Sequence, residues 1–205
     1  MTQNIEGLDE NRIERDPIKQ FQLWFDEAIA AKLPMPDAMN LATVTPDGRP
    51  TARMVLLKQV DVDGFVFFTN YQSSKARQLD INPYAALVFY WSQFERQVRV
   101  EGKVAKTSAE ESAAYFKTRP RESQIGAWAS PQSEVISARD VLEQRAHELA
   151  DKYCDREIDC PAHWGGFRLK PDRIEFWKGR VGRLHDRILY ELQPDDTWTI
   201  KRLAP

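Results

Sequence analysis

The sequence is poor in the residues that build disulfide frameworks and metal sites. Its 205 residues include only two cysteines, Cys154 and Cys160, and three histidines. Two cysteines are too few for a disulfide framework, and the C-x5-C spacing is not a usual zinc pattern. His163 is near Cys160 in the chain, but a fourth ligand is missing. We therefore expect free thiols and no bound metal.

Long apolar runs are also missing. No stretch approaches the roughly 20 apolar residues that span a bilayer. Residues 1–16 are polar and acidic and lack the apolar core of a signal peptide. The net charge of −2 gives no general attraction to nucleic acid or to an anionic membrane. We expect a cytoplasmic protein without nucleic-acid or membrane partners.

The common nucleotide-binding and hydrolase motifs are absent as well. There is no glycine-rich dinucleotide or P-loop motif and no Gly-x-Ser-x-Gly, so redox or group-transfer chemistry would need a bound cofactor of another kind. A chain of 205 residues with 42% apolar and 29% charged residues is ordinary for a globular protein. We expect a flexible arm over residues 1–15 and a single domain over 16–205.

The remaining pattern is one of short strands separated by turns, with a few helices. Asp16 followed by Pro17 predicts a helix start, and Ser108 with Glu111 forms a capping box. Strands of this kind with peripheral helices predict a closed β-barrel, a mainly β fold of the α+β class. The expected strands are 40–45, 51–60, 65–69, 84–91, 97–106, 166–170, 173–178, 187–192 and 197–202; the expected helices are 17–32, 73–81, 108–118 and 137–153.

Three basic clusters offer sites for anions. Residues 53–58 are a mostly apolar stretch with charged ends, for which a core strand is the favoured interpretation in isolation. Residues 73–75 open a helix, where free backbone N–H groups and a lysine suit a phosphate, although simple N-capping is favoured. Tyr115 and Arg119 share a helix face, and Ser123 follows the helix break, so this cluster suits a phosphate monoester. Together the clusters suit two separate phosphates.

The C-terminal stretch 176–190 is strongly basic. Residues 168–190 contain seven Lys/Arg and three acids, although the net charge of the chain is −2. Arg183, His185 and Arg187 alternate after a glycine-containing turn, so we expect them on one face of a strand. Such a face is either a solvated sheet edge or the wall of a pocket for a flat anion, because arginine both binds phosphate and stacks on rings.

Several separated motifs between residues 16 and 205 resemble, in the right order, those of the pyridoxine (pyridoxamine) 5′-phosphate oxidase family. The resemblance implies an FMN-binding split β-barrel that forms a homodimer with two FMN molecules at the subunit interface. It implies oxidation of pyridoxine or pyridoxamine 5′-phosphate to pyridoxal 5′-phosphate, with O2 reduced to hydrogen peroxide. The motifs are residues 53–58, Phe68-Thr69-Asn70, Glu95-Arg96-Gln97-Val98, 119–128, Gln132-Ser133, Trp164-Gly165-Gly166, Ile174-Glu175-Phe176-Trp177, Arg183-Leu184-His185-Asp186-Arg187 and Arg202-Leu203-Ala204-Pro205.

The resemblance also implies roles for individual residues. Arg183 and His185 would be catalytic and would lie over the substrate ring, on the side away from the flavin. The other substrate ligands, which hold its phosphate, would be Lys58, Tyr115, Arg119 and Ser123. The FMN ligands would be Arg53, Met54, Val55, Leu56, Leu57, Lys58, Phe68, Thr69, Ser74, Lys75, Gln97, Gln132, Ser133, Trp177 and Arg187.

Three features of the sequence limit how far the residue roles of the family can be transferred to this chain. Arg53 and Lys58 are five residues apart, so in a regular strand they would point to opposite faces. If both serve the site, a bulge or a strong twist intervenes, or they serve different parts of it. Ser74 stands where many family members carry arginine. Residues 1–15 contain Arg12 and Arg15 but no tyrosine, so they lack part of the segment that covers the substrate in other members.

Two other functions remain open at this point. One is a related split-barrel oxidase or reductase that acts on another ring, as in the phenazine-pathway relatives, which resemble this chain less at 119–128 and 185–187. The other is a non-catalytic carrier of flavin or pyridoxal phosphate, which needs phosphate ligands but no open face above the flavin. Turnover of pyridoxine 5′-phosphate would separate the three.

Overall fold

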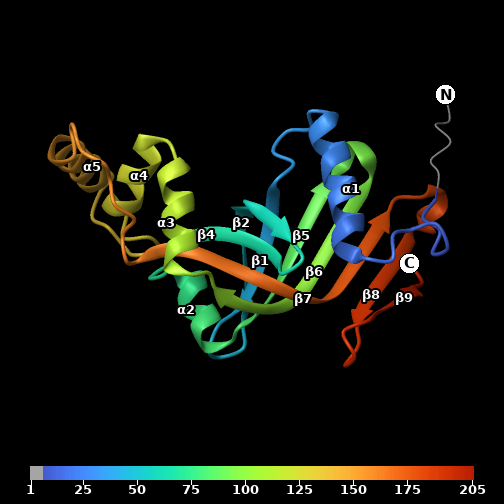
Figure 1. The fold of residues 1–205 in the computed structure, drawn as a ribbon. Helices are drawn as coiled ribbons and strands as arrows, with labels where there is room; N and C mark the ends of the chain where they lie inside the picture. Colours follow the sequence, from blue (N-terminus) through green and yellow to red (C-terminus); the bar gives the residue numbers. More distant parts are fainter. Residues whose placement is uncertain (1–6) are drawn as a thin grey trace.

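A curled antiparallel sheet forms the centre of the molecule (Figure 1). The computed structural model describes residues 7–205, and its main run of strands is ordered β2-β1-β5-β6-β7-β4-β3, with β8 and β9 attached beside β7. The strands are β1 (Ala38–Val44), β2 (Pro50–Leu56), β3 (Gln59–Asp61), β4 (Gly64–Asn70), β5 (Tyr84–Trp91), β6 (Arg96–Lys106), β7 (Trp164–Lys178), β8 (Asp186–Leu192) and β9 (Trp198–Arg202).

The curl of the sheet brings β2 and β4 into contact although four strands separate them in the order. No ladder joins these two strands, so the barrel is split at this point. The first half of β7 pairs with β4 and its second half pairs with β8, while β6 follows the other edge of β7 along its length. The expected fold class, a mainly β split barrel with peripheral helices, is confirmed.

The single strand expected over 51–60 is wrong. β2 ends at Leu56 and β3 begins at Gln59, and the chain changes partners between them. The N–H of Leu57 donates to the carbonyl of Asp37, whereas the N–H of Lys58 donates to the carbonyl of Val66 in β4, both at 2.8 Å. This break lies beside the candidate site and decides where Lys58 points.

The two strands expected at 166–170 and 173–178 form one strand, β7. Pro171 lies opposite Gly102, where the register with β6 shifts. A Cβ atom on Gly102 would lie 2.1 Å from the carbonyl oxygen of Lys170, so only glycine permits this close approach. The proline therefore interrupts the ladder locally without ending the strand.

Within residues 7–205, five α-helices lie around the sheet. Asp16 caps α1 and Ser108 caps α3, as expected, while α4 was not expected because Pro120 ends α3 but restarts a helix at once. Helices α3, α4 and α5 gather at one end of the molecule and β8 and β9 lie at the other (Figure 1). None of the described helices is long and apolar enough to cross a membrane. The helices are α1 (Pro17–Ala30), α2 (Ser74–Ile81), α3 (Ala109–Thr118), α4 (Arg121–Ala129) and α5 (Asp140–Lys152).

Aromatic side chains fill the barrel and join α1 to it. Phe21 of α1 is fully buried and packs on Phe65 and Phe89, with ring centroids 4.8 and 4.9 Å away. Of the arm expected over 1–15, residues 1–6 lie outside the described residues. Residues 7–15 contact β8, where the hydroxyl of Tyr190 donates to the carbonyl of Glu14 at 2.6 Å.

Candidate active site

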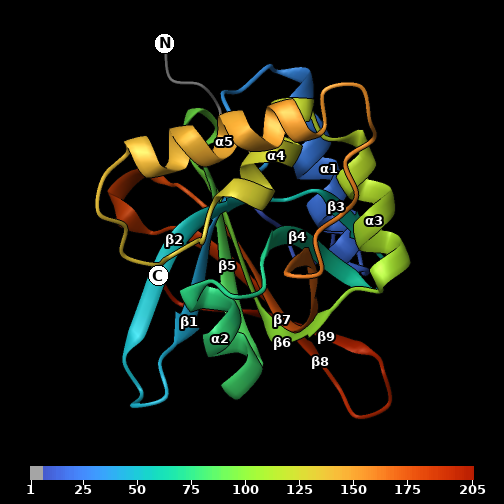
Figure 2. The same ribbon diagram turned by 90° about the vertical axis from the view of Figure 1, so that its left-hand side faces the viewer.

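A cavity of about 360 Å³ lies between β2, β4, α2 and α3. β2 and β4 contact each other and lie side by side above α2 in Figure 1, while Figure 2 shows α2 below the level of β4 and α3 at the right-hand side. All of the lining residues except Trp164 are among those that the sequence assigns to the flavin or the substrate. They are Arg53, Met54, Val55, Leu56, Lys58, Phe68, Thr69, Lys75, Tyr115, Arg119, Gln132 and Trp164.

Lys75 lies at one end of the cavity, in the first turn of α2. Its Nζ contacts the side-chain oxygens of Thr69, Ser73 and Gln132 at 3.1, 3.3 and 2.8 Å. Burial, together with the positive charge of Arg53, lowers the pKa of Lys75 to about 8. All of these oxygens are neutral, so within residues 7–205 the ammonium has no carboxylate partner.

Arg53 lies beside Lys75 and is held in the same way. Its guanidinium donates to the carbonyl of Leu41 at 3.0 Å and to the hydroxyl of Thr51 at 2.7 Å, and Gln78 of α2 accepts at 3.3 Å. Burial lowers the pKa of Arg53. Two neighbouring cations that face only neutral groups in the described chain fit an anionic ligand such as a phosphate monoester.

Arg119 forms a second positive point in the cavity. Its guanidinium lies 4.6 Å from the ring centre of Trp164 and 5.7 Å from that of Phe116. Burial lowers its pKa, and its buried NH1 atom has no hydrogen-bond partner in the part of the chain that the structure describes. An unpaired donor on a buried cation is costly, so this position also fits an anion.

Stacked aromatic rings connect the cavity to the sheet. Phe68 stacks on Tyr115 at 4.0 Å and on Trp164 at 5.4 Å between ring centres. Gly166 lies opposite Phe68 in the ladder, and a Cβ atom there would lie 2.9 Å from the Phe68 ring and 2.5 Å from the hydroxyl of Thr107. Sequence reasoning gave Trp164 no role, although a tryptophan followed by two strand glycines signals a close approach of this kind.

The break between β2 and β3 answers the question of how Arg53 and Lys58 can serve one site. Both line the cavity, because Lys58 lies outside the regular strand. The Nζ of Lys58 pairs with Asp37 at 2.9 Å, so its charge is already matched by a carboxylate. Leu57 between them is 4% exposed and belongs to the core instead of the cavity lining.

Three serines assigned from the sequence do not line the cavity. Ser74 begins α2 directly before Lys75, and the N–H of Ser123 donates to the carbonyl of Pro120 in the first turn of α4. Ser133 follows Gln132 and has a positive φ of 73°. Each serine is adjacent to a cavity element, and their roles remain predictions.

The shared strand face expected for Arg183, His185 and Arg187 is wrong. A turn covers Val181–Arg183, with φ of 72° at Gly182 and 62° at Arg183, and β8 begins only at Asp186. Two successive left-handed residues reverse the chain direction, so alternation along a strand does not apply. Of the three side chains, only that of Arg187 belongs to a strand.

His185 is oriented by its neighbours in this turn. Its Nδ1 accepts a hydrogen bond from the N–H of Arg180 at 3.1 Å, and its ring packs on that of Trp177 at 4.7 Å. When the ring is neutral, its proton is therefore on Nε2, the nitrogen that remains available to a ligand.

The remaining assigned residues form a separate group on the sheet. Gln97, Trp177 and Arg187 are ladder neighbours in β6, β7 and β8, on the face opposite the buried row of Val98, Phe176 and Ile188. Neither these three residues nor Arg183 and His185 line the cavity. The strands β1 and β5 separate them from β2. We call Gln97, Trp177 and Arg187 the sheet-face group, and Arg53, Lys75 and Arg119 the cavity group.

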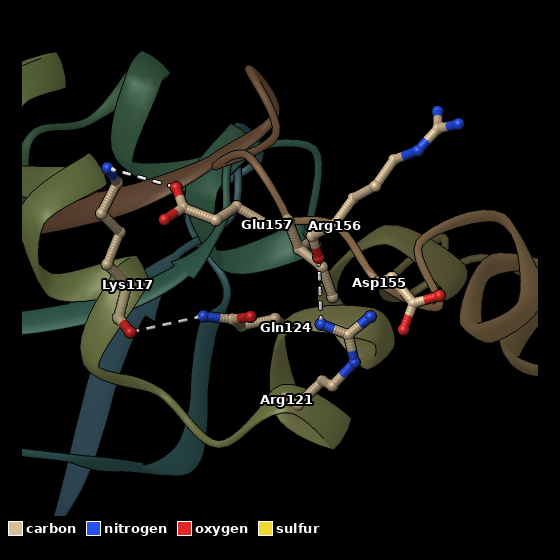
Figure 3. A pocket seen from close by; sticks show the side chains of 7 residues that line it. Lys117, Arg121, Gln124, Asp155, Arg156 and Glu157 are labelled. Carbon is tan, nitrogen blue, oxygen red and sulfur yellow. Dashed lines mark hydrogen bonds and ion pairs between the residues drawn. The ribbon is translucent and has the colours of Figure 1, made fainter.

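A second groove, of about 400 Å³, lies between the end of α3, α4 and residues 155–158 (Figure 3). Arg121 donates there to the carbonyls of Arg156 and Cys154, at 3.1 and 3.3 Å, and so ties the segment after α5 to α4. Lys117 pairs with Glu157 at 3.8 Å. These contacts hold the segment that leads to Trp164, and oxygens of the chain match the charges of Lys117 and Arg121.

The fold and the cavity define a class: a split-barrel protein that binds flat, phosphate-bearing ligands. Two family models cover most of the chain. One, described as pyridoxamine 5′-phosphate oxidase, matches residues 25–153, and the other, described as the pyridoxine 5′-phosphate oxidase C-terminal dimerisation region, matches residues 164–205. The chain therefore belongs to the pyridoxine/pyridoxamine 5′-phosphate oxidase family, whose members are oxidoreductases.

Individual relatives agree with this assignment. The chain is 56% identical to the pyridoxine/pyridoxamine 5′-phosphate oxidase of Trichormus variabilis, over 98% of this chain and 94% of the relative. It is 57% identical to that of Cupriavidus necator, over 97% and 93%. Among solved structures, PhzG from Burkholderia lata, in complex with tetrahydrophenazine-1-carboxylic acid, matches with a TM-score of 0.92 and 28% identity over 99% and 100% of the two chains. A related FMN-binding protein from Nostoc punctiforme shares the fold, with a TM-score of 0.73 and 18% identity over 90% and 97%.

Proposed function

We propose that this protein oxidises pyridoxine 5′-phosphate and pyridoxamine 5′-phosphate to pyridoxal 5′-phosphate, with FMN as cofactor and O2 reduced to hydrogen peroxide. The observation that carries the proposal is the cavity group, which consists of two positive points without carboxylate partners in the described chain. FMN and the substrate each end in one phosphate. Relatives of 56 and 57% identity carry the name of this activity.

Arg53 and Lys75 suit the phosphate of FMN. They lie together beside α2, and Lys75 contacts only neutral side-chain oxygens in the described chain. A single phosphate at this end favours FMN over a dinucleotide flavin. When bound, FMN supplies the two-electron acceptor that O2 regenerates.

Arg119 suits the phosphate of the substrate. Its buried NH1 atom has no partner among residues 7–205, and the stacked rings of Tyr115 and Trp164 leave little freedom to the guanidinium. The phosphate keeps its charge throughout the reaction, so this contact stabilises bound substrate and transition state alike. Lys58 and Ser123 are proposed as further ligands of the same phosphate.

Arg183 and His185 are proposed to hold the ring of the substrate. With Nδ1 of His185 engaged by Arg180, its Nε2–H can donate to the hydroxyl or amino group at the reacting carbon. The guanidinium of Arg183 offers a flat surface that can press the substrate ring into place. Both residues act through position, on which the rate of transfer depends steeply.

We infer that a second copy of the chain completes each site. Trp177, Arg183, His185 and Arg187 belong to the region 164–205, which matches a family model described as a dimerisation region. Gln97 lies in the neighbouring strand, opposite Trp177. One chain carries these residues away from its own cavity. A homodimer in which the sheet-face group of one copy adjoins the cavity group of the other would bring all assigned residues to two equivalent FMN sites.

Turnover with pyridoxine 5′-phosphate tests the proposal. Purified protein supplied with FMN should form pyridoxal 5′-phosphate and hydrogen peroxide in equal amounts, and denaturation should release FMN. Bound FMN without any turnover of either B6 phosphate would contradict the proposed reaction and leave the carrier function.

A second candidate is oxidation of a reduced phenazine carboxylate. The close structural match to PhzG favours it. The B6 phosphates are favoured instead by the relatives named pyridoxine/pyridoxamine 5′-phosphate oxidase, which are 56 and 57% identical to this chain, against 28% for PhzG. Parallel assays with both substrates decide between them.

A further inference from the structure

Glu175 is an unusual residue for the face of the sheet on which it lies. It follows the same alternation in β7 as Trp177 and therefore points away from the core, beside the sheet-face group. Carboxylates on such a face are normally solvated, yet Glu175 is only 5% exposed. Sequence reasoning gave it no role.

The partners of Glu175 account for its burial. Its Oε1 accepts from Nε of Arg187 at 2.7 Å, and its Oε2 accepts from NH2 of Arg187 at 3.1 Å, which is the fork geometry of a two-bond ion pair. The same Oε2 accepts from Arg99 at 3.3 Å. Arg99 also pairs with Glu101, whereas Glu175 is the one carboxylate that Arg187 contacts within residues 7–205.

The guanidinium of Arg187 is thereby fixed on two sides. Its third nitrogen, NH1, donates to the carbonyl of Ala204 at 3.0 Å, so three of its N–H groups are used inside the chain. A guanidinium has five, and the remaining two are on the terminal nitrogens, available to a ligand. An arginine side chain without such a frame loses considerable rotamer freedom when it binds.

We propose that Glu175 is a positioning residue for the flavin: it holds Arg187 in the orientation in which the guanidinium binds FMN. This inference rests on the proposed function, and specifically on Arg187 as an FMN ligand. Glu175 itself does not touch FMN in this proposal. It acts by ordering Arg187 before the cofactor arrives, which lowers the entropic cost of binding.

A purely electrostatic role of Glu175 would change FMN affinity in the opposite direction. If Glu175 only partly neutralised Arg187, its removal would leave a stronger positive field and FMN would bind more tightly. Positioning predicts weaker binding and neutralisation predicts tighter binding, so the direction of the change separates the two.

The test measures FMN affinity of the apoprotein by quenching of FMN fluorescence, independently of turnover. Glu175→Gln retains the shape and an acceptor oxygen but loses the charge that holds the fork. We expect its Kd for FMN to rise about five- to thirtyfold, from the usual entropic cost of ordering an arginine side chain. Glu191→Gln is the matched control, because Glu191 lies on the same face of β8 and pairs with Arg173 and Lys201 but does not touch Arg187; its Kd should stay unchanged.

A double-mutant cycle with Arg187→Lys shows whether Glu175 acts through Arg187. Lysine cannot form the fork, so adding Glu175→Gln to Arg187→Lys should cost little further affinity. Three outcomes would each overturn the proposal. They are an equal loss of FMN affinity in both backgrounds, tighter FMN binding by Glu175→Gln, and a loss of affinity that only follows dissociation of the dimer in sedimentation. If Glu175→Gln does not fold, Glu175→Asp keeps the charge but shortens the reach, and wild-type Kd in that variant would overturn it. Failure of the wild-type protein to bind FMN would instead contradict the proposed function.

Discussion

The affinity for FMN should fall as the pH rises above about 8, because Lys75 then loses its proton. Burial and the neighbouring charge of Arg53 lower the pKa of Lys75 from its ordinary 10.5 to about 8 in the protein without ligand. An anionic phosphate beside this ammonium favours its charged form. Binding of FMN therefore raises the pKa of Lys75, and the protein takes up a proton in this pH range. Protonated Lys75 is thus the form that binds FMN.

The size of the effect follows from the pKa. With a value of about 8, roughly half of the lysine is charged at pH 8 and about a tenth at pH 9. The Kd for FMN should therefore be about tenfold higher at pH 9 than on the plateau below pH 7. Fluorescence titrations of the apoprotein between pH 6.5 and 9.5 measure this directly. Lys75→Arg is the control, since arginine stays charged over this range and should give a flat profile.

The same shift has a consequence for the stability of the apoprotein. Because the folded pKa of Lys75 lies below the unfolded value of 10.5, the unfolded chain binds more protons between about pH 8 and 10.5. The contribution of Lys75 is therefore destabilising at and below pH 8, and it fades as the pH rises through this window. Lys75→Met should remove this contribution in thermal unfolding. A wild-type Kd that stays constant from pH 7 to 9, or an equal slope in Lys75→Arg, would refute the reasoning.

Three further predictions follow from particular contacts. Arg119→Ala should raise the KM for pyridoxine 5′-phosphate about ten- to hundredfold with a smaller change in kcat, because the phosphate contact is uniform along the reaction; an unchanged KM in steady-state assays would remove Arg119 from the site. Gly102→Ala should lower the free energy of unfolding by about 3 kcal/mol, since its Cβ would lie 2.1 Å from the Lys170 carbonyl oxygen. Gly126→Ala, which has open space in α4, should raise the free energy of unfolding by about 0.5–1 kcal/mol. Chemical denaturation that ranks the two variants the other way would contradict the register of β6 and β7. Arg183→Lys should slow single-turnover flavin reduction while FMN stays bound, and a wild-type rate would show that Arg183 does not position the substrate.

The cavity was the part of the site that the sequence predicted best. Its residues come from short motifs, such as 53–58 and 115–119, in which local spacing already brings the functional groups together. The break at Leu57 and Lys58 was not visible, because both halves of the stretch read as strand and the change of partner from β1 to β4 depends on the tertiary fold. Helix α4 was missed for a similar reason: Pro120 ends one helix and opens the next, and sequence pattern records only the end.

The C-terminal stretch shows that alternating residues share a face only where the chain is a regular strand. Alternation placed Arg183, His185 and Arg187 on one face, but Gly182 and Arg183 both have positive φ and turn the chain before β8 begins. A glycine marks where such a turn can occur, but it does not determine whether the next residue follows it into the left-handed region. A glycine-containing turn was expected before Arg183, and its extension through Arg183 required the structure.

The division of the assigned residues between two surfaces could not be deduced from motif order at all. Motifs in sequence carry no information on whether they meet within one chain or between two. In this fold the cavity group lines the cavity and the sheet-face group does not, so the two groups do not meet in the cavity of one chain. Either the assignment of Arg187 to FMN is wrong, or the site is shared by two copies. An Arg187→Lys variant that binds FMN as tightly as the wild type would establish the first; weakened binding together with a concentration-dependent Kd near the dimer dissociation constant would establish the second.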